Sequence, residues 1–172
     1  MTEDAYAFVS GPTMVEEFTG IAVSTDELGG PTTHARQSGA ASVVVADVAA
    51  AVEWVDALLQ FVPDNVDNLP TFQPTGDDDN RPTPEAGELM PTTSTGSYDV
   101  RKVIQAIVDD GEQLELRPRW ASNVVTSLAA IGGMPIGIVA NQPVQLAGTL
   151  DIPASQKAAR FVAMCEIGRA HV

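Results

Sequence analysis

The chain has 172 residues and a formal charge of -14, because 23 acidic residues outnumber 9 lysines and arginines. Such an excess of acid repels phosphates, which argues against nucleic acid or an anionic membrane surface as the main partner. Cys165 is the single cysteine, so an internal disulfide and a multi-cysteine zinc site are excluded. No apolar run is long enough to span a bilayer and the first residues are acidic, so we expect a soluble, cytoplasmic protein.

The first part of the chain alternates signals for short strands and helices. β-Branched and aromatic runs predict strands, while Pro, Gly and capping residues mark where helices begin and stop. In chain order we expect a strand over residues 6–10, a helix over 13–18 that stops at Gly20, a short helix between Ser24 and Gly30, a buried strand over 42–46, and a helix from Asp47 to Val62.

Residues 63–96 differ in character from the rest of the chain. They are rich in proline, include three consecutive aspartates from Asp77, and have almost no hydrophobic periodicity. These features predict a long connector between two globular parts, with the acidic run as a solvated face.

The last part again mixes helix and strand signals. Asp99 is a suitable cap for an amphipathic helix that ends at Gly111, and the pair Gly132-Gly133 predicts a tight hairpin turn. We expect strands over residues 113–116, 123–131, 136–140 and 146–150, followed by a helix over 154–164 whose inward face carries Ala158, Phe161, Val162 and Cys165. Strands interleaved with helices indicate an α/β layered fold.

The sequence contains no catalytic or metal-ligating motif that identifies a reaction by itself. Its distinctive feature is a set of unusual phrases in a fixed order: FVSGPTMVEEFTG (8–20), ELGGPTTHARQSG (27–39), YDVRKVIQAIVDDGE (98–112), IGIVANQPVQLAGTLD (136–151) and SQKAARFVAMC (155–165). Together they resemble the carboxyltransferase (beta) subunits of biotin-dependent acyl-CoA carboxylases, of the propionyl-CoA and acetyl-CoA carboxylase type. The chain departs from the family's usual residues at Ser127-Leu128, Ala130 and Pro153.

The resemblance implies a crotonase-like (ClpP/crotonase) β-α spiral in each half of the subunit. It places residues 1–66 at the end of the N-terminal domain, 67–97 in the linker, and 98–166 at the start of the C-terminal domain. Residues 167–172 are expected to be an adapter-derived tail, since with Glu166 they match the translation of GAG ATC GGA AGA GCA CAC GTC. The alternative is a genuine basic helix end, and under either interpretation His171 is not a ligand. Met1 would match an internal position of the family.

The resemblance also implies the reaction, its co-substrate and its partners. The expected activity is carboxyl transfer from carboxybiotin to the α-carbon of a short acyl-CoA, with biotin carried on a biotin carboxyl carrier protein or a biotinylated alpha subunit. A homo-oligomer of carboxyltransferase subunits is expected, with no metal in this segment. The family's paired oxyanion-binding amides lie outside the matching phrases, so no catalytic residue is predicted here and the isolated chain is expected to be inactive. The alternatives are a subunit of a biotin-dependent decarboxylase and a truncated, non-catalytic interaction module.

Two groups of residues are the candidate binding sites. Gly29, Gly30 and His34 could form a backbone turn close to CoA or to a partner subunit, or a helix end with a hydrogen-bonded histidine. Asn141, Gln142 and Pro143 follow a predicted strand, where they could line the biotin or acyl pocket or form a turn capped by side chains.

A few further side chains need an interpretation. The scarce cations Arg117, Arg119 and Lys102 could contact a CoA phosphate or form surface ion pairs. The two tryptophans are expected in the core and Cys165 is expected to be a buried thiol.

Overall fold

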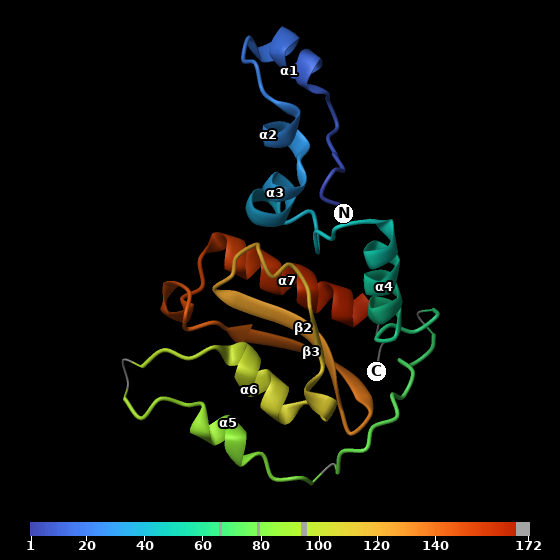
Figure 1. Ribbon diagram of the computed structural model, residues 1–172, viewed down its shortest axis with the longest axis vertical. Coiled ribbons are helices and arrows are strands. Elements are labelled where there is room, and N and C mark those ends of the chain that lie inside the picture. The colour runs from blue at the N-terminus through green and yellow to red at the C-terminus, as the bar shows by residue number, and fades with distance from the viewer. Residues whose placement is uncertain (66, 79, 94–95, 168–172) are drawn as a thin grey trace.

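The structure is a computed structural model that describes residues 1–65, 67–78, 80–93 and 96–167. An arm of short helices, α1 to α3, extends from a larger body (Figure 1). In the body, strands β2 (Val124–Ile131) and β3 (Met134–Asn141) lie between helices α6 (Val100–Ile107) and α7 (Ile152–Ile167). Helix α4 (Val48–Leu59) lies beside this body, and the connector with α5 (Pro84–Glu88) runs along its lower edge (Figure 1). The predicted tail beyond Ile167 lies outside the described residues.

Local capping signals determine the helices of the arm. Helix α1 (Pro12–Thr19) begins at a proline and ends where Gly20 takes a left-handed φ of 72°. Helix α2 (Thr25–Gly29) has a capping box in which Ser24 and Glu27 satisfy each other's backbone N–H groups. Helix α3 (Pro31–Thr33) and a π-helical turn (His34–Ser38) follow. The two helices predicted from the sequence in this region are confirmed.

The two strands predicted in the first part are wrong. Residues 6–10 and 42–46 form no strand, and the described chain has only an isolated parallel bridge there, between Thr2 and Val45. Strand-forming side chains need a neighbouring strand whose backbone groups can pair with theirs. Here the N–H of Ala7 instead donates to the carbonyl of Gly29, at 3.0 Å.

Helix α4 (Val48–Leu59) forms where the sequence predicts it. The Asp47 carboxylate accepts a hydrogen bond of 2.9 Å from the N–H of Ala50, which caps the first turn. Its apolar residues do repeat at helical spacing, yet a stripe of them remains exposed. This α4 stripe consists of Val48, Val52, Val55 and Leu59, which are 46–71% exposed.

The connector is fastened to the body over part of its length. It contains α5 (Pro84–Glu88). The Arg81 guanidinium donates to the carbonyls of Ala106 and Val108, at 3.2 and 2.7 Å, and so caps the C-terminal end of α6. The carboxylate of Asp77 pairs with Arg81 at 3.1 Å and accepts from the N–H of Asp110. The prediction of a solvated acidic face was therefore wrong for Asp77, because its carboxylate orients the capping arginine.

The body contains a three-stranded antiparallel sheet in the order β1-β2-β3. The strands are β1 (Gln113–Glu115), β2 (Val124–Ile131) and β3 (Met134–Asn141), which confirms three of the four strands predicted in this part, and the hairpin. Gly132 and Gly133 turn with φ of 56° and 72°, and the Asp109 carboxylate accepts from both of their N–H groups. The hairpin is thus held at its turn by the segment that follows α6.

Two helices cover the two faces of the sheet, and alternate residues of β2 point to each. Helix α6 (Val100–Ile107), capped by Asp99, packs Ile104 against Val125 and Ala129. Helix α7 (Ile152–Ile167) packs Phe161 against Leu128 on the opposite face. After α6 comes a 3-10 turn (Asp109–Gly111).

The strand predicted over residues 146–150 is wrong. The segment contains a 3-10 turn (Leu146–Gly148) in which Leu146, Ala147 and Gly148 have φ of 48°, 52° and 69°. Three successive left-handed residues are incompatible with an extended strand. The inward face predicted for α7 is confirmed for Phe161, at 2% exposed, but wrong for Val162, at 45%.

Candidate functional site

The first predicted group, Gly29, Gly30 and His34, lies in the arm and makes contacts with both the N–H and the carbonyl of Ala7. The Gly29 carbonyl accepts from the N–H of Ala7, and His34 Nε2 lies 2.6 Å from the carbonyl oxygen of Ala7. A Cβ on Gly29 would collide with Ala7, and one on Gly30 would lie 2.7 Å from the Asp26 carbonyl oxygen. Both glycines are therefore needed for the close approach of two backbone segments.

His34 has a partner for each ring nitrogen. Its Nδ1 lies 2.9 Å from the hydroxyl of Ser38, opposite the Ala7 contact. The side chain also borders an apolar cavity of about 550 Å³ that Tyr6 and Trp54 help to line. The geometry matches a hydrogen-bonded histidine at a helix end, and a role of these residues in ligand binding stays a prediction.

The second predicted group lies at the end of β3. Gln142 is 1% exposed, and its side-chain amide donates to Asp99 while its Oε1 accepts from the N–H of Val100 at 3.2 Å. Asn141 Nδ2 donates to the Gly148 carbonyl at 2.8 Å. Pro143 continues the turn and is half-buried. Both amide side chains thus fix the turn, and a role of Asn141, Gln142 and Pro143 in a biotin or acyl pocket stays a prediction.

The contact with Gln142 also affects the charge of Asp99. Burial raises the pKa of Asp99, but hydrogen bonds from the Gln142 side chain and from the N–H of Arg101 more than offset it and hold the pKa below its ordinary value. Asp99 therefore stays ionised and caps α6.

Sequence reasoning missed Asn123, which completes this turn. It is 2% exposed; its Nδ2 donates to the Thr149 carbonyl at 2.7 Å and to Asp151 Oδ1 at 3.2 Å, while its own carbonyl accepts from the N–H of Gln142. Asp151 in turn accepts from the N–H of Ala154 in the first turn of α7. A polar residue directly before a buried strand was the signal that could have identified it.

Lys157 was also missed, although helical spacing from Ala154 and Phe161 puts it on the inward stripe of α7. Its side chain is 0% exposed, and Nζ donates to the carbonyls of Val124 and Ala121, at 2.6 and 3.4 Å. Burial lowers the pKa of Lys157 to about 8. Because Val124 pairs with Asn141 across the sheet, Lys157 holds the strand end that faces the predicted site.

The two predicted groups are on different parts of the molecule. Gly29, Gly30 and His34 belong to the arm, whereas the turn after β3 belongs to the body (Figure 1). In the part of the chain that the structure describes, no hydrogen bond joins one group to the other. They are two candidate surfaces rather than one site.

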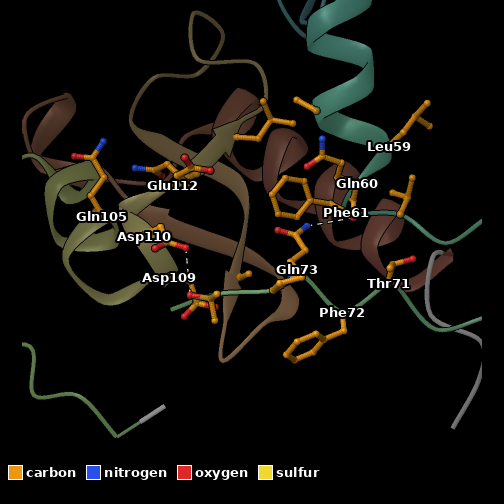
Figure 2. Close-up of a pocket in the computed structure, with 18 of the residues that line it drawn as sticks. Leu59, Gln60, Phe61, Thr71, Phe72, Gln73, Gln105, Asp109, Asp110 and Glu112 are labelled. Atoms are coloured by element: carbon orange, nitrogen blue, oxygen red, sulfur yellow. Dashed lines mark hydrogen bonds between the residues drawn. The ribbon is translucent and has the colours of Figure 1, made fainter. Parts of the chain in front are cut away.

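A further cavity, of about 850 Å³, lies between the connector and the body. Figure 2 shows Phe72 and Gln73 of the connector, and Gln60 and Phe61 at the end of α4, facing Asp109, Asp110 and Glu112 of the body. The carboxylates of Asp109 and Asp110 are engaged, with the hairpin turn and with Thr75 respectively. Among the described residues no group of three or more His, Cys, Asp or Glu side chains could hold a metal ion. The carboxylates of Asp109 and Asp110 are therefore occupied by structural contacts.

The remaining predictions have mixed outcomes. Trp120 is 4% exposed and Trp54 packs against the buried cluster around Phe161, so the tryptophans are core residues as expected. Cys165 packs at the edge of the same cluster and is half-buried. Within the described ranges, none of the predicted cations Arg117, Arg119 and Lys102 forms an ion pair.

The bidentate ion pair of the body is made by Arg101, which the sequence did not single out. Its Nε and Nη2 donate to the Glu115 carboxylate at 2.6 and 2.9 Å. These hydrogen bonds raise the pKa of Arg101.

Comparison with known proteins decides the family. The model of the carboxyl transferase domain matches residues 1–169. The chain belongs to the carboxyl transferase domain family. It is 38% identical to the propionyl-CoA carboxylase beta chain of Roseobacter denitrificans, over 95% of this chain and 32% of that protein. It is 41% identical to the methylmalonyl-CoA carboxyltransferase 12S subunit of Propionibacterium freudenreichii, over 96% and 32%.

Solved structures of the carboxyl transferase family agree with this assignment. The crystal structure of a transcarboxylase 12S hexamer with methylmalonyl-CoA and methylmalonic acid bound has a TM-score of 0.92 and 40% identity, covering 98% of this chain and 32% of that one. A single-chain long-chain acyl-CoA carboxylase has a TM-score of 0.76 at 32% identity, over 96% of this chain and 16% of that one. The predicted crotonase-like α/β fold is confirmed. The chain spans about a third of the carboxyltransferase subunits that it matches.

None of the helices in the described ranges combines the length and the apolar character needed to cross a membrane.

Proposed function

We propose that this chain is part of a carboxyltransferase subunit that moves a carboxyl group from carboxybiotin to the α-carbon of a short acyl-CoA, propionyl-CoA or acetyl-CoA. The observation that carries the proposal is its similarity, at 38–41% identity over 95–96% of the chain, to subunits named for propionyl-CoA carboxylation and methylmalonyl-CoA carboxyl transfer. The matching fold of the 12S subunit, with its bound methylmalonyl-CoA, supports the acyl-CoA substrate class.

The chemistry needs few titratable protein groups. Carboxybiotin supplies the carboxyl group as CO2 together with a ureido nitrogen that takes the α-proton, and the resulting thioester enolate forms the new carbon–carbon bond to CO2. Before that bond forms, negative charge develops on two oxygens, on biotin as CO2 leaves and on the thioester as the α-proton is removed. Preorganised backbone N–H groups stabilise both, at about 3–4 kcal/mol of barrier for each donor. Residues that hold these backbone N–H groups in place therefore lower the reaction barrier more than acids or bases would.

The side chains of the turn after β3 likewise hold backbone in place. Asn141, Gln142 and Pro143 carry no titratable side chain, and the amide groups of Asn123 and Gln142 are used to fix the backbone. We propose that the turn shapes a wall of the biotin or acyl pocket and takes no part in proton transfer. The partners proposed are a biotinylated carrier and further copies of the subunit, since the related 12S protein is a hexamer.

A chimera tests the proposal. Residues 1–166 of this chain would replace the matching third of the Propionibacterium 12S subunit, and carboxyl transfer from methylmalonyl-CoA would be measured. We expect turnover within about tenfold of the parent subunit, because the two chains share 41% identity through the exchanged part. A chimera that assembles as a hexamer but has no activity contradicts the proposal. The isolated chain should show no turnover with free biotin and propionyl-CoA.

A decarboxylase is the second candidate, because the methylmalonyl-CoA decarboxylase alpha subunit of Veillonella parvula is 38% identical over 92% of this chain. The enzyme that contains this chain, isolated with its own partners, separates the two. A carboxylase forms methylmalonyl-CoA from propionyl-CoA and bicarbonate only when ATP is supplied. A decarboxylase releases CO2 from methylmalonyl-CoA without ATP.

A further inference from the structure

Lys157 is a charged side chain at a position where an apolar one would be expected. It shares the inward face of α7 with Ala154 and Phe161, and like them it is buried, at 0% exposed. None of the ion pairs in the described part of the chain includes Lys157. A buried ammonium group without a carboxylate costs more free energy than an apolar side chain of similar volume. The charge is therefore useful only if it makes a contact that an apolar side chain cannot make.

The ammonium group of Lys157 contacts both ends of one turn. Its Nζ donates to the carbonyl of Val124 at 2.6 Å and to the carbonyl of Ala121 at 3.4 Å. The Ala121 carbonyl also accepts from the N–H of Val124 at 3.1 Å, which closes the turn. Ala121 has a φ of 45°, which is unfavourable for a residue with a Cβ. Because an ammonium group has three donors, it can hold both carbonyls at once and keep this turn in its unfavourable conformation.

Asn123, inside this turn, connects it to the turn after β3. The carbonyl of Asn123 accepts from the N–H of Gln142 at 2.8 Å. Its Nδ2 donates to the carbonyl of Thr149 at 2.7 Å and to Asp151 Oδ1 at 3.2 Å. Asp151 in turn caps the first turn of α7. Helix α7 therefore holds the turn around Asn123 by two separate contacts, and a shift of this turn would move the backbone of Gln142.

We propose that Lys157 is a positioning residue for carboxyl transfer, acting through Asn123 on the turn after β3. Lys157 fixes the turn that contains Asn123, and Asn123 fixes the backbone at Gln142, where the proposed wall of the biotin or acyl pocket begins. The inference rests on the proposed function of that wall. Lys157 itself contacts no substrate and transfers no proton, so its effect on the reaction is indirect.

Lys157→Met, in the enzyme that contains this chain, tests the proposal, because methionine fills a similar volume but donates no hydrogen bond. Initial rates of carboxyl transfer from methylmalonyl-CoA or malonyl-CoA to free biotin give kcat and a KM for each substrate. We expect the KM for the acyl-CoA or the KM for biotin to rise by about tenfold or more, because the wall of that pocket is displaced. The substrate whose KM rises identifies the pocket that the turn borders.

Phe161→Leu is the matched control, because it weakens the packing of the same face of α7 and removes no hydrogen bond. Both of its KM values should stay within about twofold of those of the unmodified enzyme. A purely structural role of Lys157 would lower the amount of active enzyme, so that the apparent kcat falls while both KM values stay the same. Unchanged KM values in Lys157→Met, or an equal rise in Phe161→Leu, overturn the proposal.

Hydrogen exchange separates failure of this inference from failure of the proposed function. Mass spectrometry on the same assembled enzymes follows deuterium uptake in the peptide that contains residues 142–149. Lys157→Met is expected to speed this uptake by about fivefold or more, and Phe161→Leu to leave it unchanged. An unmodified enzyme without carboxyl transfer contradicts the proposed function itself. Faster uptake in Lys157→Met then still supports its hold on the turn, and equal uptake in all three enzymes overturns it.

Discussion

The side-chain amide of Gln142 donates to the carboxylate of Asp99, joining the end of β3 to the first turn of α6 across 43 residues of sequence. The same Gln142 side chain accepts from the N–H of Val100. One buried amide therefore satisfies two groups at the start of a helix and fixes the turn that follows the strand.

Replacing Gln142 with alanine is expected to destabilise the chain by about 2–3 kcal/mol, because a buried backbone N–H and a partly buried carboxylate lose their partner. Urea unfolding measures the change. Gln145→Ala, three residues away at an exposed position, is the matched control and should change stability by less than about 0.5 kcal/mol. Equal stabilities for the two variants contradict the assignment of Gln142 as the link.

Phe161→Ala is expected to cost about 3–5 kcal/mol, because Phe161 is 2% exposed and fills the space between α7 and Leu128. The neighbouring Val162, at 45% exposed, provides the comparison, and Val162→Ala should cost less than about 1 kcal/mol. Calorimetric or urea unfolding of both variants checks the expected order, and its reversal would mean that α7 packs by its other face.

Lys157 predicts a rise in stability at alkaline pH. Its pKa of about 8 in the folded chain lies below the ordinary value of 10.5, so between these values the unfolded chain binds more protons than the folded one. Stability should therefore rise from about pH 8 to about pH 10.5, by about 3 kcal/mol from this group. Below about pH 8 both states are protonated and Lys157 contributes no slope.

Urea unfolding at a series of pH values measures the effect of Lys157. Lys157→Met removes the titrating group at nearly constant length and should flatten the curve over this interval. Lys102→Gln, at an exposed position, should retain the rise. A rise that persists in Lys157→Met would assign it to other groups.

Arg81→Ala should loosen the connector, because the guanidinium that caps α6 and pairs with Asp77 is lost. Limited proteolysis is expected to cleave the connector several-fold faster, since local opening determines the rate of cleavage. Arg119→Ala removes an exposed arginine that has no ion pair in the described chain and should leave cleavage unchanged. Equal cleavage of both variants would show that Arg81 does not hold the connector.

The α4 stripe predicts that the isolated chain associates. Four aliphatic side chains on one helix face are 46–71% exposed, and β1 and β3 are edge strands of the sheet. The double variant Val52→Ser and Val55→Ser should reduce association, as measured by light scattering after size-exclusion chromatography. Since both side chains are exposed, the cost in stability should be below about 1 kcal/mol. A monodisperse monomer of the unmodified chain contradicts the prediction.

The elements that the sequence predicted correctly are those specified by neighbouring residues. Ser24 and Glu27 cap α2 within one turn, and Gly132-Gly133 sets the hairpin. The wrong strands, over residues 6–10, 42–46 and 146–150, have suitable side chains but form no ladder in the described chain, where Val45 has only an isolated bridge to Thr2. A strand depends on a neighbour that is often far away in sequence, so composition alone cannot predict it.

For the candidate site, too, local patterns predicted the position but not the contacts between distant residues. Its position after β3 followed from the strand pattern, but the partners of Gln142 lie about forty residues away, at Asp99 and Val100. Helical spacing places Lys157 on the apolar stripe of α7. The carbonyls that it contacts, those of Val124 and Ala121, belong to a segment more than thirty residues away. Such contacts between distant segments require the three-dimensional arrangement.

The capping of α6 by Arg81 constrains how homologous chains can vary in length. The N–H of Gln73 donates to the Gly133 carbonyl, and Arg81 donates to the carbonyls that end α6. Both contacts can form only if the number of residues between Gln73 and Arg81 stays the same. Insertions and deletions should therefore be rare over residues 73–81 and frequent after Arg81, in the part of the connector that precedes Asp99. The connector would then consist of a stretch of fixed length followed by one of free length.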